Sequence, residues 1–223
     1  MTKDVRKFIY DRLGETAAPP VLEEIMTAFA LDRRQAREVV AGIAEAKQVV
    51  LLPGTDRILM AHPFSAVATP FRVTRGDGKR YFANCSWDSI AMHVMFDAEI
   101  WIDSYCHHCG ARIEIELDDG EVVAASPEHT IVYLGLPAAK WWQDVVHACS
   151  NTMLFFASTE HLKDWISENA IASPGEALSV QTTIALSRPI YSGKLDLDYQ
   201  RPGPDALRAH FASLGLTGPF WAI

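Results

Sequence analysis

A thiol and a carboxylate lie three positions apart in the segment Asn84-Cys85-Ser86-Trp87-Asp88. The segment is predicted to begin a helix that runs to about Met95, and residues i and i+3 share one face of a helix. The free amides at a helix N-terminus favour a thiolate, so Cys85 can be ionised there, with Asp88 beside it as a proton carrier. Such a pair suits metal–thiolate or acid–base chemistry. The alternative is a buried cysteine beside an aspartate that only caps the helix.

The cysteine content indicates free thiols rather than a disulfide framework. The 223 residues include four cysteines, Cys85, Cys106, Cys109 and Cys149. No run of about 18 apolar residues occurs, and the first residues lack the apolar stretch of a signal peptide. We therefore expect a cytoplasmic protein without a membrane partner, in which the cysteines are thiols, ligands or packing groups.

The charge distribution argues against nucleic acid as a partner. The net charge is −8, and the first 60 residues hold nine Lys and Arg against nine Asp and Glu, so the acidic excess lies later. Basic residues Arg33, Arg34 and Arg37 open a predicted helix, where a DNA reader has its basic groups. Asp32 and Glu38 flank them, which favours a solvated structural face.

The first 60 residues have the pattern of a winged-helix domain. Apolar positions predict helices over 5–13, 21–29 and 33–44, and the last is capped by Asp32. Two short apolar strands around Pro53-Gly54 follow. A turn-rich stretch from His62 to Pro70 then marks a boundary. We expect a winged-helix-like three-helix domain over residues 1–68.

The second part, residues 69–223, reads as a mixed α/β domain with a small antiparallel-rich sheet, giving an α+β chain. A hairpin is predicted over 71–82 and strands over 99–103, 111–117 and 130–134. One long helix is predicted from Ala138 to Phe156, with Cys149 facing inward. His62, His129 and His161 are interpreted as satisfied polar groups near element ends.

Several motifs together resemble the alkylmercury (organomercurial) lyase family. They are Tyr81-Phe82-Ala83-Asn84-Cys85-Ser86-Trp87-Asp88, then Ser104-Tyr105-Cys106 with Gly110, then Cys149 before Leu154-Phe155-Phe156-Ala157-Ser158 and Asp164-Trp165. The likeness covers roughly residues 70–170 by motif and the N-terminal domain by organisation. The chain after about residue 190 has no match to the best-known bacterial enzymes, and we treat it as a C-terminal extension.

The resemblance implies protonolysis of a carbon–mercury bond, giving a hydrocarbon and Hg(II). Cys85 and Cys149 correspond to the mercury-binding cysteines, Asp88 is the proton-transferring carboxylate in the same metal site, and Cys106 is structural. The implied partners are a small organometallic or electrophilic substrate and small thiols that remove the product. Hg(II) is the bound product, and no cofactor is required. Thiolates are the ligands that a soft metal prefers.

Two features depart from the family pattern. Counting back from Phe155-Phe156, Ser150 rather than Cys149 occupies the expected register, and one residue turns a helix position by about 100°. The second is Cys109, which makes Cys106-His107-His108-Cys109 a Cys-x-x-Cys motif. Zinc at Cys106 and Cys109 needs a second ligand pair, which only His147 and Cys149 offer, so packing or adventitious soft-metal binding is favoured over zinc or a redox dithiol.

Three other functions stay open from the sequence. A sibling enzyme can use Cys85 and Asp88 on a substrate without mercury. A winged-helix regulator can sense soft metals or thiols, but it needs a basic face on the third helix. A storage protein can sequester a soft metal without chemistry. Release of the organic product separates these functions from a lyase.

Overall fold

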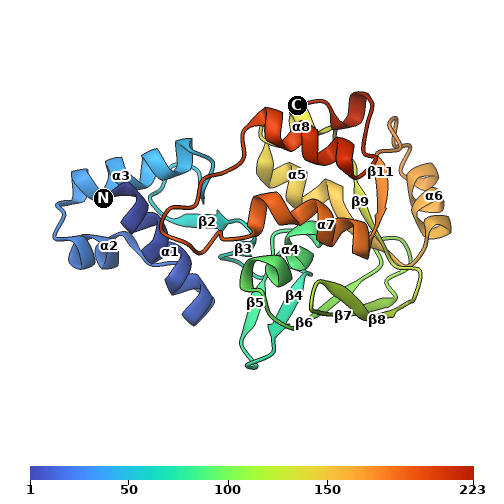
Figure 1. The fold of residues 1–223 in the computed structure, drawn as a ribbon, viewed down its shortest axis with the longest axis horizontal. Helices are drawn as coiled ribbons and strands as arrows, with labels where there is room; N and C mark the ends of the chain where they lie inside the picture. The colour runs from blue at the N-terminus through green and yellow to red at the C-terminus, as the bar shows by residue number, and fades with distance from the viewer.

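The computed structural model describes residues 1–223 and has a mixed α+β fold, as expected. The N-terminal part contains three helices, α1 (Thr2–Thr16), α2 (Leu22–Phe29) and α3 (Arg33–Glu45). Asp32 caps α3 by accepting a hydrogen bond from the amide of Gln35 at 2.8 Å, as its side chain predicts. The strands β1 (Val50–Leu51), β2 (Ile58–Ala61) and β3 (Phe64–Ser65) form a small antiparallel sheet. This part projects to one side of the molecule (Figure 1).

A five-stranded antiparallel sheet forms the base of the larger part. Its strands are β4 (Arg72–Arg75), β5 (Arg80–Phe82), β6 (Ile100–Tyr105), β7 (Arg112–Asp118) and β8 (Glu121–Ser126), in the order β5-β4-β6-β7-β8. Residues of β6 and β7 alternate between buried and exposed, which is the pattern of a sheet with one face on the core.

Helix α4 (Ser86–Phe96) crosses the middle of the molecule and is buried on nearly all sides. It packs on the five-stranded sheet and lies beside α7 (Val180–Tyr191) (Figure 1). Its buried residues include polar ones, Asp88 and His93 among them, and these need hydrogen-bond partners inside the protein. The position of α4 places its N-terminus, with Cys85, inside the protein.

A second antiparallel sheet, in the order β10-β9-β11, lies beside α4. Its strands are β9 (Ile131–Leu134), β10 (Met153–Phe156) and β11 (Glu176–Ser179), accompanied by the short helix η1 (Ala138–Lys140) and by α5 (Val145–Thr152) and α6 (Thr159–Glu168). The single helix predicted over 138–156 is therefore wrong. The four bulky apolar residues of β10 are all buried and pair with β9, so tertiary pairing overrides the helical pattern.

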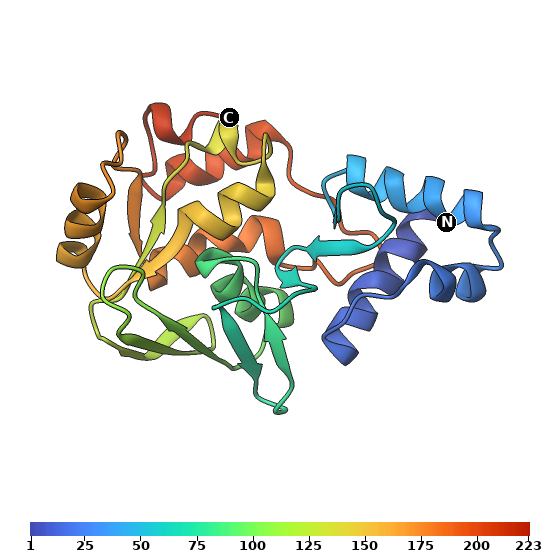
Figure 2. The same ribbon diagram turned by 180° about the vertical axis from the view of Figure 1, so that it is seen from behind.

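The C-terminal segment ties the two parts together. After α7 the chain returns to the N-terminal helices, and the Nη1 of buried Arg6 donates a hydrogen bond to the carbonyl of Lys194 at 2.8 Å. The chain then forms α8 (Pro204–Ser213) and η2 (Pro219–Trp221) above α5 (Figure 2). Trp221 is buried against Trp141, with ring centroids 6.2 Å apart. None of the helices is both long and apolar enough to span a membrane.

Candidate active site

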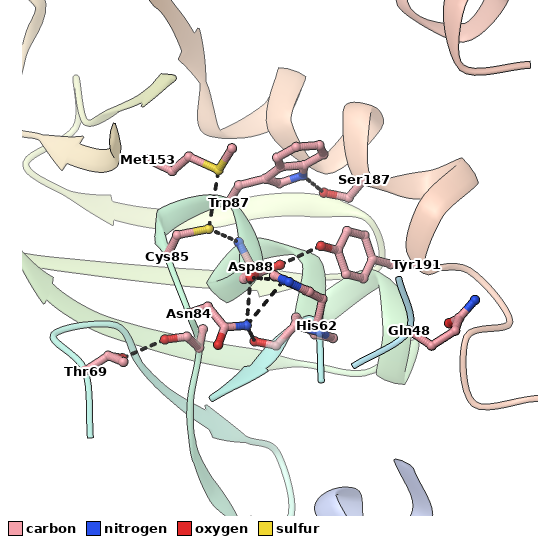
Figure 3. Close-up of polar contacts among 12 residues, drawn as sticks. Gln48, His62, Thr69, Asn84, Cys85, Trp87, Asp88, Met153, Ser187 and Tyr191 are labelled. Carbon is pink, nitrogen blue, oxygen red and sulfur yellow. Dashed lines mark hydrogen bonds and ion pairs between the residues drawn. The ribbon is translucent and has the colours of Figure 1, made fainter. Parts of the chain in front are cut away.

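Cys85 is the N-cap of α4, immediately before the first helical turn. Its sulfur accepts a hydrogen bond from the amide of Asp88 at 3.3 Å, and it lies 3.7 Å from the sulfur of Met153, to which the thiol donates (Figure 3). Burial, Cys149 and Asp88 raise the pKa of Cys85, and only the Asp88 amide opposes them. The possibility that the helix N-terminus ionises Cys85 is therefore not realised, because desolvation and two anionic neighbours outweigh one amide.

Asp88 lies one helical turn from Cys85 and is 2% exposed. Its Oδ1 accepts a hydrogen bond from the Tyr191 hydroxyl at 2.5 Å, and its Oδ2 accepts one from the Asn84 amide at 2.9 Å (Figure 3). Burial acts to raise the pKa of Asp88, but the charge of His62 and these donors lower it below its ordinary value. The resting side chain is a carboxylate held by donors on both oxygens.

His62 is the cation that faces this carboxylate. It follows β2, and its Nδ1 lies 3.0 Å from Asp88 Oδ2. Burial acts to lower the pKa of His62, but Asp88 and Cys149 raise it to about 9. The Tyr10 hydroxyl lies 2.7 Å from the backbone carbonyl of Gln48, its closer acceptor, and 3.2 Å from that of His62. The contact with Asp88 agrees with the interpretation of His62 as a hydrogen-bonded polar group near an element end, although its partner lies far away in sequence.

Cys149, and not Ser150, faces this group. Cys149 and Val145 are one turn apart on α5 and both line the same pocket, as positions i and i+4 of a helix must. Ser150 is exposed. Ligand atoms of His62, Asp88 and Cys149 all lie within 4.8 Å of one another. The neighbouring Cys85 side chain lowers the pKa of Cys149 to about 7, with help from His62 and against burial.

The pocket that contains the two thiols is narrow and largely aromatic. Its free space is about 40 Å³, and Trp87, Trp141 and Trp142 form part of its wall. The indole of Trp87 donates to Ser187 at 2.8 Å, which fixes it between α4 and α7. Lys194 and Arg201 also line the pocket. Arg201 adds positive charge beside the anionic groups, whereas burial and the charge of Arg201 lower the pKa of Lys194 to about 7, so Lys194 loses its charge as the pH rises through neutral.

The other two cysteines lie outside this pocket. Cys106 is buried and Cys109 is exposed, in the loop between β6 and β7. His147 and Cys149, the second ligand pair considered for a zinc ion, do not join Cys106 and Cys109 in one cluster. Cys149 lines the pocket, and the exposed His147 accepts a hydrogen bond from Asn151 at 3.2 Å.

The site thus combines two sulfurs of different acidity with one carboxylate. Cys149 holds a thiolate near neutral pH, whereas Cys85 keeps its proton. The Asp88 carboxylate can receive a proton, and the His62 cation stabilises the neighbouring anions. Two thiolates sharing one soft ion lie no more than about 5 Å apart, and Cys85 and Cys149 line the same small pocket. The arrangement suits capture of a soft electrophile followed by proton transfer.

The family model and the relatives that the sequence matches all name one family. The family model for alkylmercury lyase matches residues 64–192. An alkylmercury lyase of Staphylococcus epidermidis is 26% identical over 174 residues, which is 76% of each chain. One from Bacillus cereus is 26% identical over 122 residues, 55% of this chain and 53% of that protein. The mercury-bound form of MerB2 has the same fold, with a TM-score of 0.69 at 18% identity over 87% of this chain and 91% of that one.

The unequal acidity of the two thiols predicts a titration. In a pH titration followed by thiolate ultraviolet absorbance, one thiol is expected to ionise near pH 7 as the pH rises, and Cys149→Ser should remove that step. His62→Gln keeps a donor for Asp88 but removes the charge, so the step should move to higher pH. His129→Gln, an exposed control, should leave it unchanged. A step unaffected by His62→Gln would show that His62 does not stabilise the thiolate.

Proposed function

The chain belongs to the alkylmercury lyase family, and we propose that Cys85, Asp88 and Cys149 cleave carbon–mercury bonds by protonolysis in the pocket beside His62. The enzyme converts an organomercurial to a hydrocarbon and Hg(II). The observation that supports these residues is the meeting of a low-pKa thiol, a protonated thiol and a buried carboxylate at one aromatic pocket. Mercury enters as substrate and leaves as product.

Cys149 makes the first attack. Its thiolate displaces the outgoing ligand, such as a small thiolate, from an R–Hg⁺ group and forms a sulfur–mercury bond. The lowered pKa of Cys149 makes a substantial fraction of this nucleophile available near neutral pH. Its neighbour His62 offsets the added negative charge, so His62 acts as a positioning and charge-balancing residue.

Cys85 then supplies both the second ligand and the proton. As its sulfur bonds to mercury, its proton passes to the Asp88 carboxylate. The two sulfur ligands weaken the bond from mercury to carbon, and Asp88 returns the proton to the carbon as that bond breaks. The electron pair of the broken bond forms the new C–H bond. The hydrocarbon leaves, and Hg(II) stays between the two sulfurs with no change in oxidation state.

Small thiols complete the cycle by ligand exchange. Two external thiolates displace Cys85 and Cys149 from Hg(II), and protonation then restores Cys85. This step needs a thiol-rich, reducing compartment, so we place the enzyme in the cytoplasm. All four cysteines are free thiols, which fits that compartment.

The pocket walls set which organic groups enter. The accessible volume of about 40 Å³ is sufficient for a small organic group. Trp87 is fixed by Ser187, whereas Trp142 is partly exposed. We infer that the organic group of the substrate packs against these indole rings.

We propose that residues 1–68 form a winged-helix-like domain that serves the active site in residues 69–223. This part supplies His62, two residues before the range that the family model matches. It does not offer a free basic surface, because Arg33, Arg34 and Arg37 form ion pairs with Glu23, Glu38 and Asp56 at 2.5, 2.7 and 2.7 Å. These ion pairs favour a structural role over DNA binding.

Both cysteines are needed for turnover in this account. Cys85→Ala and Cys149→Ala should each abolish release of benzene from phenylmercury in excess thiol, because one sulfur cannot activate the carbon–mercury bond. Ser150→Ala changes the exposed neighbour of Cys149 and should retain full activity. Benzene release at the normal rate by either cysteine variant would refute the two-thiol site. Binding of mercury by the unaltered chain without any hydrocarbon release would indicate a storage protein.

Asp88 is expected to act on proton transfer and not on capture. Asp88→Asn should bind mercury with its two sulfurs but release hydrocarbon about 10²–10⁴ times more slowly, the usual range for loss of a general acid. Asp97→Asn, at the other end of α4, is the matched control. Single-turnover assays with methylmercury separate binding from methane release. Methane release at an unchanged rate would remove Asp88 from the mechanism.

A further inference from the structure

A second group of soft ligands lies outside the active-site pocket. Cys106 and Cys109 come from the loop between β6 and β7, and His161 comes from the first turns of α6. Their ligand atoms, Sγ, Sγ and Nδ1, all lie within 4.8 Å of one another. None of the three lines the pocket that contains Cys85 and Cys149. The reaction described above does not use this cluster.

The spacing of these atoms matches that around a tetrahedral metal ion. His161 Nδ1 lies 3.7 Å from Cys106 Sγ and 3.5 Å from Cys109 Sγ. A tetrahedral zinc ion, with Zn–S about 2.3 Å and Zn–N about 2.0–2.1 Å, places sulfur and nitrogen about 3.5–3.6 Å apart. An ion can therefore enter with little movement of the three side chains.

The backbone holds the two cysteines in a tight turn. The amide of Gly110 donates to the carbonyl of Cys106 at 2.9 Å, and the amide of Cys106 donates to the carbonyl of Ala111 at 2.8 Å. Gly110 has φ +73°, a left-handed conformation that glycine adopts without strain. The turn keeps both sulfurs on the side that faces α6.

His108 lies next to the cluster but is not one of its three ligands. The Nδ1 of His108 is buried without a hydrogen-bond partner, and the His108 ring lies 5.3 Å from that of His161, centroid to centroid. Buried polar atoms without partners are uncommon in folded proteins. Cys109, by contrast, is exposed, so the cluster is open to ions from solvent.

We propose that Cys106, Cys109 and His161 form a second metal site, for a thiophilic divalent ion of which zinc is the best match. Two sulfurs and one imidazole nitrogen are ligands that zinc prefers, and the fourth position is open to water or a small thiol. The ion would link the β6–β7 loop to α6, and so the five-stranded sheet to the segment after β10. Unlike mercury in the active site, this ion has a structural role and is not turned over.

Cobalt(II) is a direct probe, because tetrahedral cobalt–thiolate sites absorb in the visible and near ultraviolet. The reduced Cys85→Ser/Cys149→Ser protein removes the active-site sulfurs, and it should bind one equivalent of cobalt with these bands and lose them when zinc is added. Cys109→Ser and His161→Ala should each abolish the bands in that background. His129→Ala, an exposed histidine outside the cluster, should keep them.

His161→Ala and His129→Ala are also made singly in the chain that keeps Cys85 and Cys149. These two variants test the proposal even if the Cys85→Ser/Cys149→Ser protein does not fold. In the chain that keeps both active-site cysteines, His161→Ala should lose one equivalent of bound zinc and the rise in melting temperature that zinc produces, and His129→Ala should lose neither. Absence of cobalt–thiolate bands in the folded double variant would overturn the proposal. Bands or bound zinc that persist unchanged in His161→Ala would overturn it equally.

Discussion

The active site depends on one buried ion pair, between His62 and Asp88. A charged group inside a protein is costly unless a partner and further hydrogen bonds compensate for lost hydration. Here the partner lies at 3.0 Å, and Asn84 and Tyr191 supply the additional donors to the carboxylate. The pair keeps Asp88 anionic and ready to receive a proton. It also places a positive charge beside Cys149, which lowers the pKa of that thiol.

The fold is arranged so that four separate segments meet at this pair. Helix α4 brings Asp88 and Cys85, the turn after β2 brings His62, α5 brings Cys149, and the end of α7 brings Tyr191. The two sulfurs consequently have different environments. Cys85 is enclosed and donates to the Met153 sulfur, whereas Cys149 faces the cation. We propose that this asymmetry gives capture of mercury to one thiol and delivery of the proton to the other.

The sequence predicted the residues that local spacing connects. Cys85 and Asp88 were identified because one helical turn joins them, and β6 and β7 because of their alternation, whereas β8 was not predicted. His62 and Tyr191 were missed, since no spacing relates them to Asp88. Tyr191 ends α7, for which no element was predicted from the sequence. The helix predicted over 138–156 ends before Met153, because pairing with β9 is a tertiary effect. His161 was missed as a partner of Cys106 and Cys109 for the same reason.

The most direct test of the account is the pH dependence of kcat/KM for organomercurial cleavage. Activity should rise as Cys149 ionises near pH 7 and fall as His62 loses its proton near pH 9, giving a bell-shaped profile. In His62→Gln the acid limb should move to higher pH and the alkaline fall should disappear, because the charge that titrates is gone. An alkaline limb that remains at the same pH in His62→Gln would contradict the central role of the His62–Asp88 pair.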